Sequence, residues 1–330
     1  MSNKRRFTDD QLKQALDLSD SNAHAAHVLG VTPAAVGQRM KKLGMETPLK
    51  NPQDPRRQHV WEDAPTTPRK IIAWDIETLP MLAAVWHTGE QRIHSNQIVE
   101  STSIACASWQ DIAQDDITSV SLLDDPKRFK RDPYDDISLV KKIHAMLMNV
   151  GECGDILLHQ NGDRFDLKKV KARMIFHSLD PLPPIQTIDT LKASRLIGGF
   201  DSYRLDYMDK KIIGGPGKID TRGMDMWTEA CAPKSPHSMR VKAMQELVHY
   251  NRGDLPPLIR EYQRFLPYMS RHPNRAIGIG ECCPRCGGKA RTHVGYHDKI
   301  TRRYPTYRCH SCRGIYEGTF SVARAWFRPV

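Results

Sequence analysis

Between residues 70 and 270, short apolar runs alternate with longer segments whose apolar residues recur at helical spacing. The apolar runs predict β-strands, and the first of them, Ile71 to Trp74, is apolar enough to be a central strand buried on both faces. Further strands are predicted at residues 102–109, 117–123, 155–159 and 185–189, and helices at 136–148 and 167–177. Such alternation predicts an α/β fold in which helices cover a sheet.

Residues 7–44 show a different pattern, that of a small all-helical unit. Thr8 and Gln11 form a capping-box signal for a first helix, and a second helix is expected over residues 22–29. After a turn at Gly30, Thr32-Pro33 begins a third helix. The third helix is expected to run to Leu43 and to bury Val36, Met40 and Leu43.

This unit resembles a helix-turn-helix DNA-binding motif, with Ala26, Gly30 and Val36 at the spacing that the motif uses for packing and for its turn. The resemblance implies that the polar face of the third helix contacts DNA through Gln38, Arg39, Lys41 and Lys42. The alternative is a small helical interaction module.

Residues 45–69 contain five prolines among polar residues and are expected to form a linker. Four regions follow from these patterns. They are the helical unit 1–44, the linker 45–69, an α/β domain 70–270 and a basic, cysteine-containing domain 271–330.

Acidic residues stand at three points of the α/β pattern. Asp75 and Glu77 follow the first strand two residues apart, so their side chains lie on one face. Asp166 falls in the first turn of a helix after another strand, and Asp254 lies in a late helical segment. Paired carboxylates at the end of a core strand suit Mg²⁺ or Mn²⁺, although solvated acids at a strand end are the simpler alternative.

Three motifs together, Asp75-Ile-Glu77, the segment 159–166 ending in Asp166, and Tyr250-Asn-Arg-Gly-Asp254, resemble the motifs of the DEDD superfamily of exonucleases. Residues 188–192, 203–206 and 214–227 resemble a phage-type subgroup with a cysteine-rich C-terminus. The resemblance implies a ribonuclease-H-like mixed sheet flanked by helices and 3′→5′ exonuclease activity. It also implies two Mg²⁺ or Mn²⁺ ions held by Asp75, Glu77, Asp166 and Asp254.

The resemblance leaves open which residue orients the attacking water. His249 matches the histidine type of the superfamily and Tyr250 the tyrosine type. A four-residue step along a helix returns to the same face, which favours Tyr250 as the partner of Asp254. Gly253 and the prolines at 256–257 could break the helix there, which would favour His249.

The loop before Asp166 contains Asn161-Gly162, a turn signal that would bring the backbone close to a ligand, and Asn161 is expected to contact nucleic acid. Asp163 and Asp189 also lie near the motifs, and we expect them to be loop and capping acids and not metal ligands.

The C-terminal region carries two Cys-x-x-Cys pairs, each followed by glycine within two residues. This spacing is typical of a zinc ribbon that binds one Zn²⁺, with Cys282 a possible substitute for the first ligand. The predicted ligands are Cys283, Cys286, Cys309 and Cys312. Arg302 and Arg303, among interleaved tyrosines, are candidate nucleic-acid contacts.

Charge supports an anionic partner. The chain has a formal net charge of +11, and residues 271–330 alone contain 12 Lys/Arg against 3 Asp/Glu, a net charge of +9. Nucleic acid is the expected partner, DNA more than RNA, and no membrane is expected because no apolar run approaches the length of a span. With no signal-peptide pattern at the start, a cytoplasmic location is expected, in the bacterial host if a phage encodes the protein. The oligomeric state stays open.

Three other functions fit parts of the pattern. A transposase or integrase also combines a helix-turn-helix, a ribonuclease-H-like core and a zinc module, but the Asp75/Glu77 pair is not typical of it. A structure-specific endonuclease is a second alternative, because the sequence does not show whether cleavage is strictly terminal. A DNA-binding regulator on an inactive nuclease fold would not need all four acids.

Overall fold

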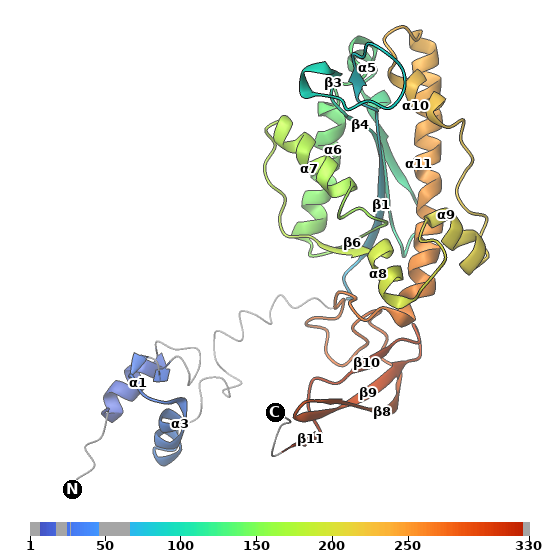
Figure 1. The fold of residues 1–330 in the computed structure, drawn as a ribbon. Coiled ribbons are helices and arrows are strands. Elements are labelled where there is room, and N and C mark those ends of the chain that lie inside the picture. Colours follow the sequence, from blue (N-terminus) through green and yellow to red (C-terminus); the bar gives the residue numbers. More distant parts are fainter. Residues whose placement is uncertain (1–6, 18–24, 27, 46–66, 326–330) are drawn as a thin grey trace. The chain divides into compact units, whose positions relative to one another are not determined.

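The computed structural model describes residues 7–17, 25–26, 28–45 and 67–325 (Figure 1). The chain forms two compact units, Met1–Thr66 and Thr67–Val330, and each is described by itself. Most of the predicted linker, residues 46–66, lies outside the described residues. Arg69, at the end of that linker, belongs to the second unit, where its amide donates to the carbonyl of Arg275 (3.1 Å).

The first unit contains the helices α1 (Asp9–Asp17) and α3 (Pro33–Lys42). The predicted capping box is confirmed, because the Thr8 amide donates to Gln11 Oε1 (2.8 Å) and the Gln11 amide to Thr8 Oγ1 (3.2 Å). Thr32 caps α3 with proline next, also as predicted. The predicted helix 22–29 lies partly outside the described residues. The buried residues of this unit are Leu12, Ala15, Leu16, Ala25, Ala26, Val36 and Met40.

One prediction about α3 is wrong, and a second residue of the helix has a partner that the sequence did not show. Leu43 was expected in the core but is 37% exposed, because it caps the helix end beyond the last buried turn. Arg39 was expected on the free polar face, but its guanidinium forms a two-pronged ion pair with Asp9 (2.7 and 2.6 Å). Arg39 therefore joins α3 to α1, whereas Gln38, Lys41 and Lys42 are exposed.

The second unit is built on a five-stranded mixed sheet with the strand order β5-β4-β1-β6-β7. The central strand pairs antiparallel with β4 and parallel with β6, so the predicted mixed α/β architecture is confirmed. The five strands are β1 (Ile71–Thr78), β4 (Ile104–Asp111), β5 (Thr118–Ser121), β6 (Ile156–His159) and β7 (Gln186–Asp189). A separate two-stranded hairpin pairs β2 (Leu82–Ala83) with β3 (Ile98–Glu100).

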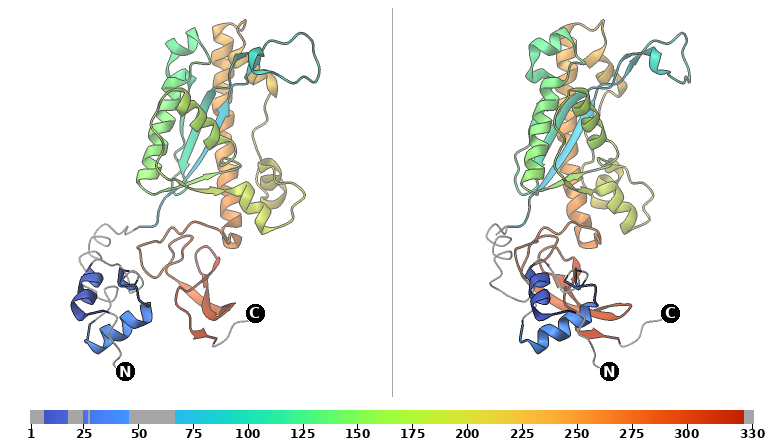
Figure 2. Two further views of the ribbon diagram at one scale, coloured as in Figure 1. Left: turned by 60° about the vertical axis from the view of Figure 1, so that its left-hand side comes forward. Right: turned by 90° about the vertical axis from the view of Figure 1, so that its left-hand side faces the viewer.

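Helices cover both faces of the sheet. Figure 1 shows α6 (Ile137–Glu152) and α7 (Asp166–Phe176) on one side of β1 and the long α11 (His237–Phe265) on the other. The two side views in Figure 2 show the same layers. The shorter elements are η1 (Ser95–Gln97), η2 (Leu122–Asp124), α5 (Pro126–Arg131), α8 (Thr190–Ile197), α9 (Leu205–Tyr207), η3 (Met208–Ile213), α10 (Met224–Cys231) and η4 (Leu266–Tyr268).

The alternation of side chains along β1 decides which residues face α11. Ile71 and Ala73 pack in one core cluster with Leu255 and Leu258 of α11, while Trp74 packs in another that contains residues of α6 and of the first half of α11. Asp75 and Glu77 follow the alternation of Ile71 and Ala73. The strand therefore presents both carboxylates to the α11 side.

Helix α11 runs unbroken through the point where the sequence allowed a break. Pro256 and Pro257 lie inside it and remove two helical hydrogen bonds, but Leu255, Leu258 and Tyr262 are buried around them. Packing therefore outweighs the local cost of the prolines, and Asp254 stays on a regular helix.

The C-terminal part of the second unit is a small antiparallel sheet, with the order β10-β9-β11 and β8 also paired to β9. Arg285 ties this part to η4, which follows α11, because its Nη1 donates to the carbonyl of Pro267 (2.8 Å) and its Nη2 to that of Ile315 (3.0 Å). The strands are β8 (Arg291–Lys299), β9 (Arg302–Cys309), β10 (Ile315–Glu317) and β11 (Ala323–Arg324). Throughout the described ranges, every helix is too short or too polar to cross a membrane.

Candidate metal sites

Three of the four predicted acidic ligands meet in one cluster. Asp75 and Glu77 from β1 and Asp254 from α11 each place one carboxylate oxygen within 4.8 Å of the others. Asp254 is almost fully buried, whereas Asp75 and Glu77 keep part of their surface accessible. Residues from distant parts of the chain thus form one group of oxygen ligands that a divalent cation could occupy.

Two buried acceptors at this cluster have no protein donor. Asn251 donates from Nδ2 to Asp75 Oδ2 (2.7 Å), which fixes the orientation of its amide. Its own Oδ1 and the Oδ1 of Asp254 are buried, and within the described part of the chain neither accepts a hydrogen bond. Buried acceptors normally have partners, so these oxygens fit the coordination of a cation.

Asp166 lies next to this cluster but is not one of the three mutually close acids. It begins α7, is 4% exposed, and its Oδ1 accepts a hydrogen bond from the Ile76 amide (3.2 Å). Its charge nevertheless acts on Asp75. Burial raises the pKa of Asp75 well above its usual range, and repulsion from the Asp166 carboxylate raises that pKa further. Asp166 is therefore anchored to β1 beside the cluster.

The other acids are also hard to ionise without a cation. Burial, followed by the charge of Asp254, raises the pKa of Glu77 to about 8. Burial raises the pKa of Asp166 to about 6 and also raises that of Asp254. A bound divalent cation would stabilise the ionised forms, so the residues present fit a Mg²⁺ or Mn²⁺ site.

Lys218 is a member of this site whose role the sequence analysis did not predict. Its Nζ lies 2.6 Å from Asp254 Oδ2 and 4.8 Å from the centre of the Tyr250 ring. Burial acts to lower the pKa of Lys218, but the carboxylate of Asp254 outweighs it and the pKa is raised. The site therefore contains one fixed positive charge among four acids.

A glycine-rich loop places Lys218 there. The amide of Gly217, which has a φ of +84°, donates to Asp209 Oδ2 (2.8 Å), and Asp209 is held by Arg260 of α11 through two 2.8 Å contacts. On α11, a Cβ at Gly253 would lie 2.3 Å from Ile219, so this glycine allows the loop to approach the helix. The approach brings the neighbouring Lys218 to Asp254.

A second group, formed by His159, Asp163 and Asp189, also places one ligand atom each within 4.8 Å of the others, but its nitrogen and all of its oxygens except the buried Oδ2 of Asp189 are close to protein groups. Trp74 Nε1 donates to His159 Nδ1 (3.1 Å), so His159 carries its proton on Nε2, which lies 3.1 Å from Asp163 Oδ1. Lys192 binds the other oxygen of Asp163 (2.7 Å), and Asp189 caps α8. Asp163 is therefore paired within its loop and Asp189 caps α8, as predicted, and their exclusion as metal ligands stays a prediction.

The same contacts shape the turn that leads to Asp166. Asn161 has a φ of +61° and its amide donates to Asp189 Oδ1 (2.9 Å). A Cβ at Gly162 would lie 2.4 Å from Cγ of the buried His159 ring. Only glycine fits at this position, and the turn delivers Asp166 to the start of α7.

Gly162→Ala is accordingly expected to destabilise the second unit by about 1–3 kcal/mol, because the His159 ring is held by hydrogen bonds on both of its nitrogens and cannot move aside. Urea unfolding would measure the change. Gly199→Ala is the matched control, since a Cβ there meets nothing within 4 Å. Equal stability of the two variants would show that the turn tolerates a side chain.

Tyr250 and His249 differ in their surroundings. Tyr250 is half-buried and packs edge-on against Trp227 at 5.9 Å between ring centres, beside Lys218. His249 is exposed to solvent. On the unbroken helix, Tyr250 is one turn before Asp254, and this geometry favours tyrosine over histidine at the acid cluster.

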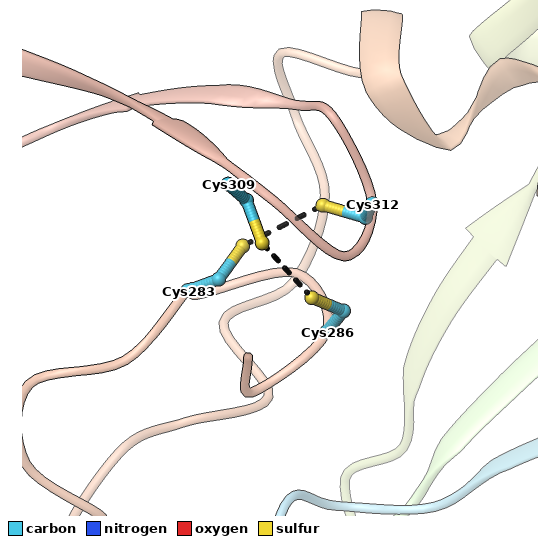
Figure 3. Close-up of side chains that lie close together, drawn as sticks. All are labelled: Cys283, Cys286, Cys309 and Cys312. Carbon is cyan, nitrogen blue, oxygen red and sulfur yellow. Dashed lines mark hydrogen bonds between the residues drawn. The ribbon is translucent and has the colours of Figure 1, made fainter. Parts of the chain in front are cut away.

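The four predicted cysteine ligands form a separate cluster (Figure 3). The Sγ atoms lie 3.7 Å apart in the pair Cys283/Cys312 and 3.5 Å apart in the pair Cys286/Cys309. Tetrahedral zinc with Zn–S bonds of ~2.3 Å requires S···S separations of ~3.8 Å, so the cluster could hold zinc. Cys282 is not one of the four.

Each Cys-x-x-Cys pair is followed by a residue in the left-handed region, Gly287 (φ +76°) and Arg313 (φ +62°). The chain can then turn its amides back toward the sulfur atoms, as the 3.4 Å contact from the Gly288 amide to Cys286 Sγ shows. Two similar turns thus present the four sulfurs to one point.

The two arginines of β9 that were predicted to contact nucleic acid have different environments. Arg302 is exposed, whereas Arg303 forms a two-pronged ion pair with Asp298 (2.6 and 2.7 Å). Part of the positive charge of Arg303 is therefore balanced within the sheet.

The two candidate sites differ in chemistry, since oxygen ligands suit hard divalent cations and thiolates suit zinc. No model of a known protein family matches the chain, and no curated protein matches it either.

Proposed function

We propose that this protein is a metal-dependent nuclease of the DEDD type, with a ribonuclease-H-like core, that shortens nucleic acid from the 3′ end. The observation that carries the proposal is the cluster of Asp75, Glu77 and Asp254, whose oxygens approach within 4.8 Å. A partly accessible group of acids beside unpartnered buried acceptors is suited to hold the cations that phosphodiester hydrolysis uses.

In this proposal, Asp75, Glu77, Asp166 and Asp254 hold two Mg²⁺ or Mn²⁺ ions. When bound, the ions would activate water as Lewis acids and stabilise the leaving oxygen. Asn251 orients Asp75 through its 2.7 Å hydrogen bond, and Lys218 adds positive charge where negative charge develops on the phosphate. Tyr250 holds the attacking water by a hydrogen bond.

The other parts support binding of DNA. The first unit has the capped helices and the exposed Gln38, Lys41 and Lys42 that a helix-turn-helix would use on DNA. The cysteine cluster would hold one Zn²⁺ and shape the basic C-terminal sheet. DNA is therefore the favoured substrate, and RNA is the alternative that an assay must compare.

Incubation with Mn²⁺ and oligonucleotides labelled at the 5′ end tests the proposal. Single-stranded and duplex forms of both DNA and RNA should be compared. A ladder of products shortened one nucleotide at a time from the 3′ end is expected. Internal cuts would assign an endonuclease, and intact oligonucleotides with retained binding would assign a regulator.

Tyr250→Phe is expected to slow cleavage by about 10²–10³-fold with little change in substrate affinity, because it removes only the hydroxyl that positions the water. Burial raises the pKa of Tyr250, so the phenol stays protonated at neutral pH and acts as a hydrogen-bond donor and not as a base. Single-turnover rates of the metal-loaded protein measure the effect.

His249→Ala is the neighbouring comparison and should change these rates less than threefold, since His249 is exposed. A large loss in His249→Ala together with normal rates in Tyr250→Phe would assign the water-positioning role to histidine instead.

A further inference from the structure

The C-terminal sheet carries a row of aromatic side chains on one face, here called the aromatic ladder and formed by His293, Tyr296, Tyr307 and Tyr316. Its ring centres are spaced 4.9 Å from His293 to Tyr296, 5.7 Å from His293 to Tyr307, and 6.0 Å from Tyr307 to Tyr316. These rings come from β8, β9 and β10, so three paired strands contribute to one continuous row.

Strand register explains why the rings share a face. His293 pairs with Tyr307, Tyr296 pairs with Pro305, and Tyr316 pairs with Tyr307. Directly paired residues project to the same side of an antiparallel sheet. Cys309 follows the alternation of Tyr307, so the ladder begins at the cysteine cluster and runs outward to Tyr296.

Two guanidinium groups accompany the ladder, and each is also ion-paired, Arg291 with Glu281 (2.5 Å) and Arg303 with Asp298 (2.6 Å). Arg291 lies over the Tyr307 ring at 5.1 Å and Arg303 over the Tyr296 ring at 5.7 Å. Tyr296 is 56% exposed and His293 is also exposed, while Tyr307 and Tyr316 are half-buried. The outer rings are therefore open to a ligand, and the inner ones are fixed by packing.

The opposite face of the same sheet differs in character. Tyr304 alternates with Tyr307 along β9 and lies under Lys299, whose Nζ is 4.7 Å from its ring centre. Glu317 binds both Lys299 and His297 on this face. Charges are paired on both faces, so the faces differ in their rings. Among the described residues Tyr304 does not join a row of aromatic rings, and the two faces can therefore be tested against each other.

We propose that the aromatic ladder is a stacking platform for the unpaired bases of single-stranded nucleic acid. Every base has an aromatic face that can stack on tyrosine or histidine, and arginines beside the rings can meet the phosphates. The net charge of +9 over residues 271–330 is complementary to such a strand. In a duplex the base faces are already stacked, so the ladder selects single strands.

This inference takes its ligand class from the proposed nuclease function and adds the strandedness of the substrate. The ladder would hold unpaired bases, while the acid cluster would act on the phosphodiester. Binding and cleavage can be measured separately, so failure of one proposal can be told from failure of the other.

The test uses the full chain with Ca²⁺ in place of Mg²⁺ or Mn²⁺, so that binding is measured by fluorescence anisotropy without cleavage. Three probes separate the contributions of unpaired bases, phosphates and paired bases to binding. They are a 12-nucleotide oligothymidylate, an abasic strand with the same number of phosphates, and a 12-base-pair duplex. The oligothymidylate is expected to bind at least tenfold more tightly than the abasic strand.

Tyr296→Ala should weaken oligothymidylate binding by roughly 5- to 150-fold, which corresponds to about 1–3 kcal/mol of stacking. Binding of the abasic strand should change less than twofold. Tyr296→Phe keeps the ring and should bind normally. Tyr296→Leu keeps apolar contact without stacking and should lose affinity as alanine does, which separates stacking from a packing defect.

Tyr304→Ala, on the opposite face of β9, is the matched control and should retain oligothymidylate binding within twofold. Equal binding of the base-containing and abasic strands, or equal losses in the Tyr296 and Tyr304 alanine variants, would overturn the platform. Ladder-dependent binding of a protein that cleaves nothing in Mn²⁺ would support the platform and contradict the nuclease.

Discussion

Asp75→Asn is expected to reduce metal-dependent cleavage by about 10³-fold or more while the protein stays folded. Asp75 belongs to the acid cluster and accepts the hydrogen bond from Asn251. The asparagine amide has the shape of the carboxylate but lacks its negative charge, so it should weaken binding of a divalent cation to the acid cluster. Single-turnover cleavage over a Mn²⁺ titration measures the loss.

The exposed acid Asp115 supplies the control, and Asp115→Asn should cleave normally. Near-normal turnover of Asp75→Asn at saturating Mn²⁺ would remove Asp75 from the proposed mechanism.

The raised pKa values predict an accompanying pH effect on the metal-free protein. An acid whose pKa is higher in the folded state binds more protons there than in the unfolded state, so stability falls as pH rises between the two values. For Glu77 this window runs from its usual value of 4.5 to about 8. Within this window, each rise of one pH unit lowers the free energy of unfolding by about 1.4 kcal/mol for each such group.

Melting temperatures of the metal-free protein should therefore fall from pH 5 to pH 8. Asp75→Asn should reduce this fall because it removes one of the mutually repelling carboxylates. Melting that is independent of pH over this range would contradict the described burial of the acids.

Cys309→Ser is expected to lose zinc and the structure of the C-terminal sheet. Cys309 ends β9, its amide donates to the Gly314 carbonyl (3.0 Å), and its sulfur lies 3.5 Å from that of Cys286. Structural zinc contributes an apparent binding free energy of about 10–16 kcal/mol, so the loss of one thiolate ligand should unfold the small sheet.

Metal analysis should find about one Zn²⁺ per chain in the parent protein and much less in the variant. Rapid proteolysis between residues 280 and 325 should accompany the loss. Cys282→Ser is the matched control, because Cys282 is adjacent in sequence but outside the cluster, and it should keep both zinc and protease resistance. If the parent protein is purified without chelator and metal analysis finds no zinc in it, the zinc site is refuted.

The sequence predicted the elements of the second unit well because their signals are local. The apolar run before Asp75 identified β1, and the two-residue step to Glu77 placed both acids on one face. The four-residue step from Tyr250 to Asp254 required only that the helix continue, which it does. The Cys-x-x-Cys spacings likewise predicted four sulfurs that the structure brings together.

Features that depend on contacts between distant segments were missed. Lys218 reaches Asp254 from a loop whose Ile219 side chain packs against Gly253 of α11, and Asn251 reaches Asp75 across 176 positions. Arg39 was assigned to a free face because the position of Asp9 could not be known. Asn251 had one local signal, its place three residues before Asp254 on a helix, where the two side chains share a face.

The most direct test of the central claim is anomalous diffraction from crystals soaked in Mn²⁺. We predict a peak within about 2.1 Å of carboxylate oxygens from Asp75, Glu77 and Asp254, with Lys218 displaced from its 2.6 Å contact with Asp254. An acid cluster without a manganese peak at a Mn²⁺ concentration of about 10 mM, with the Lys218–Asp254 pair intact, would contradict the account.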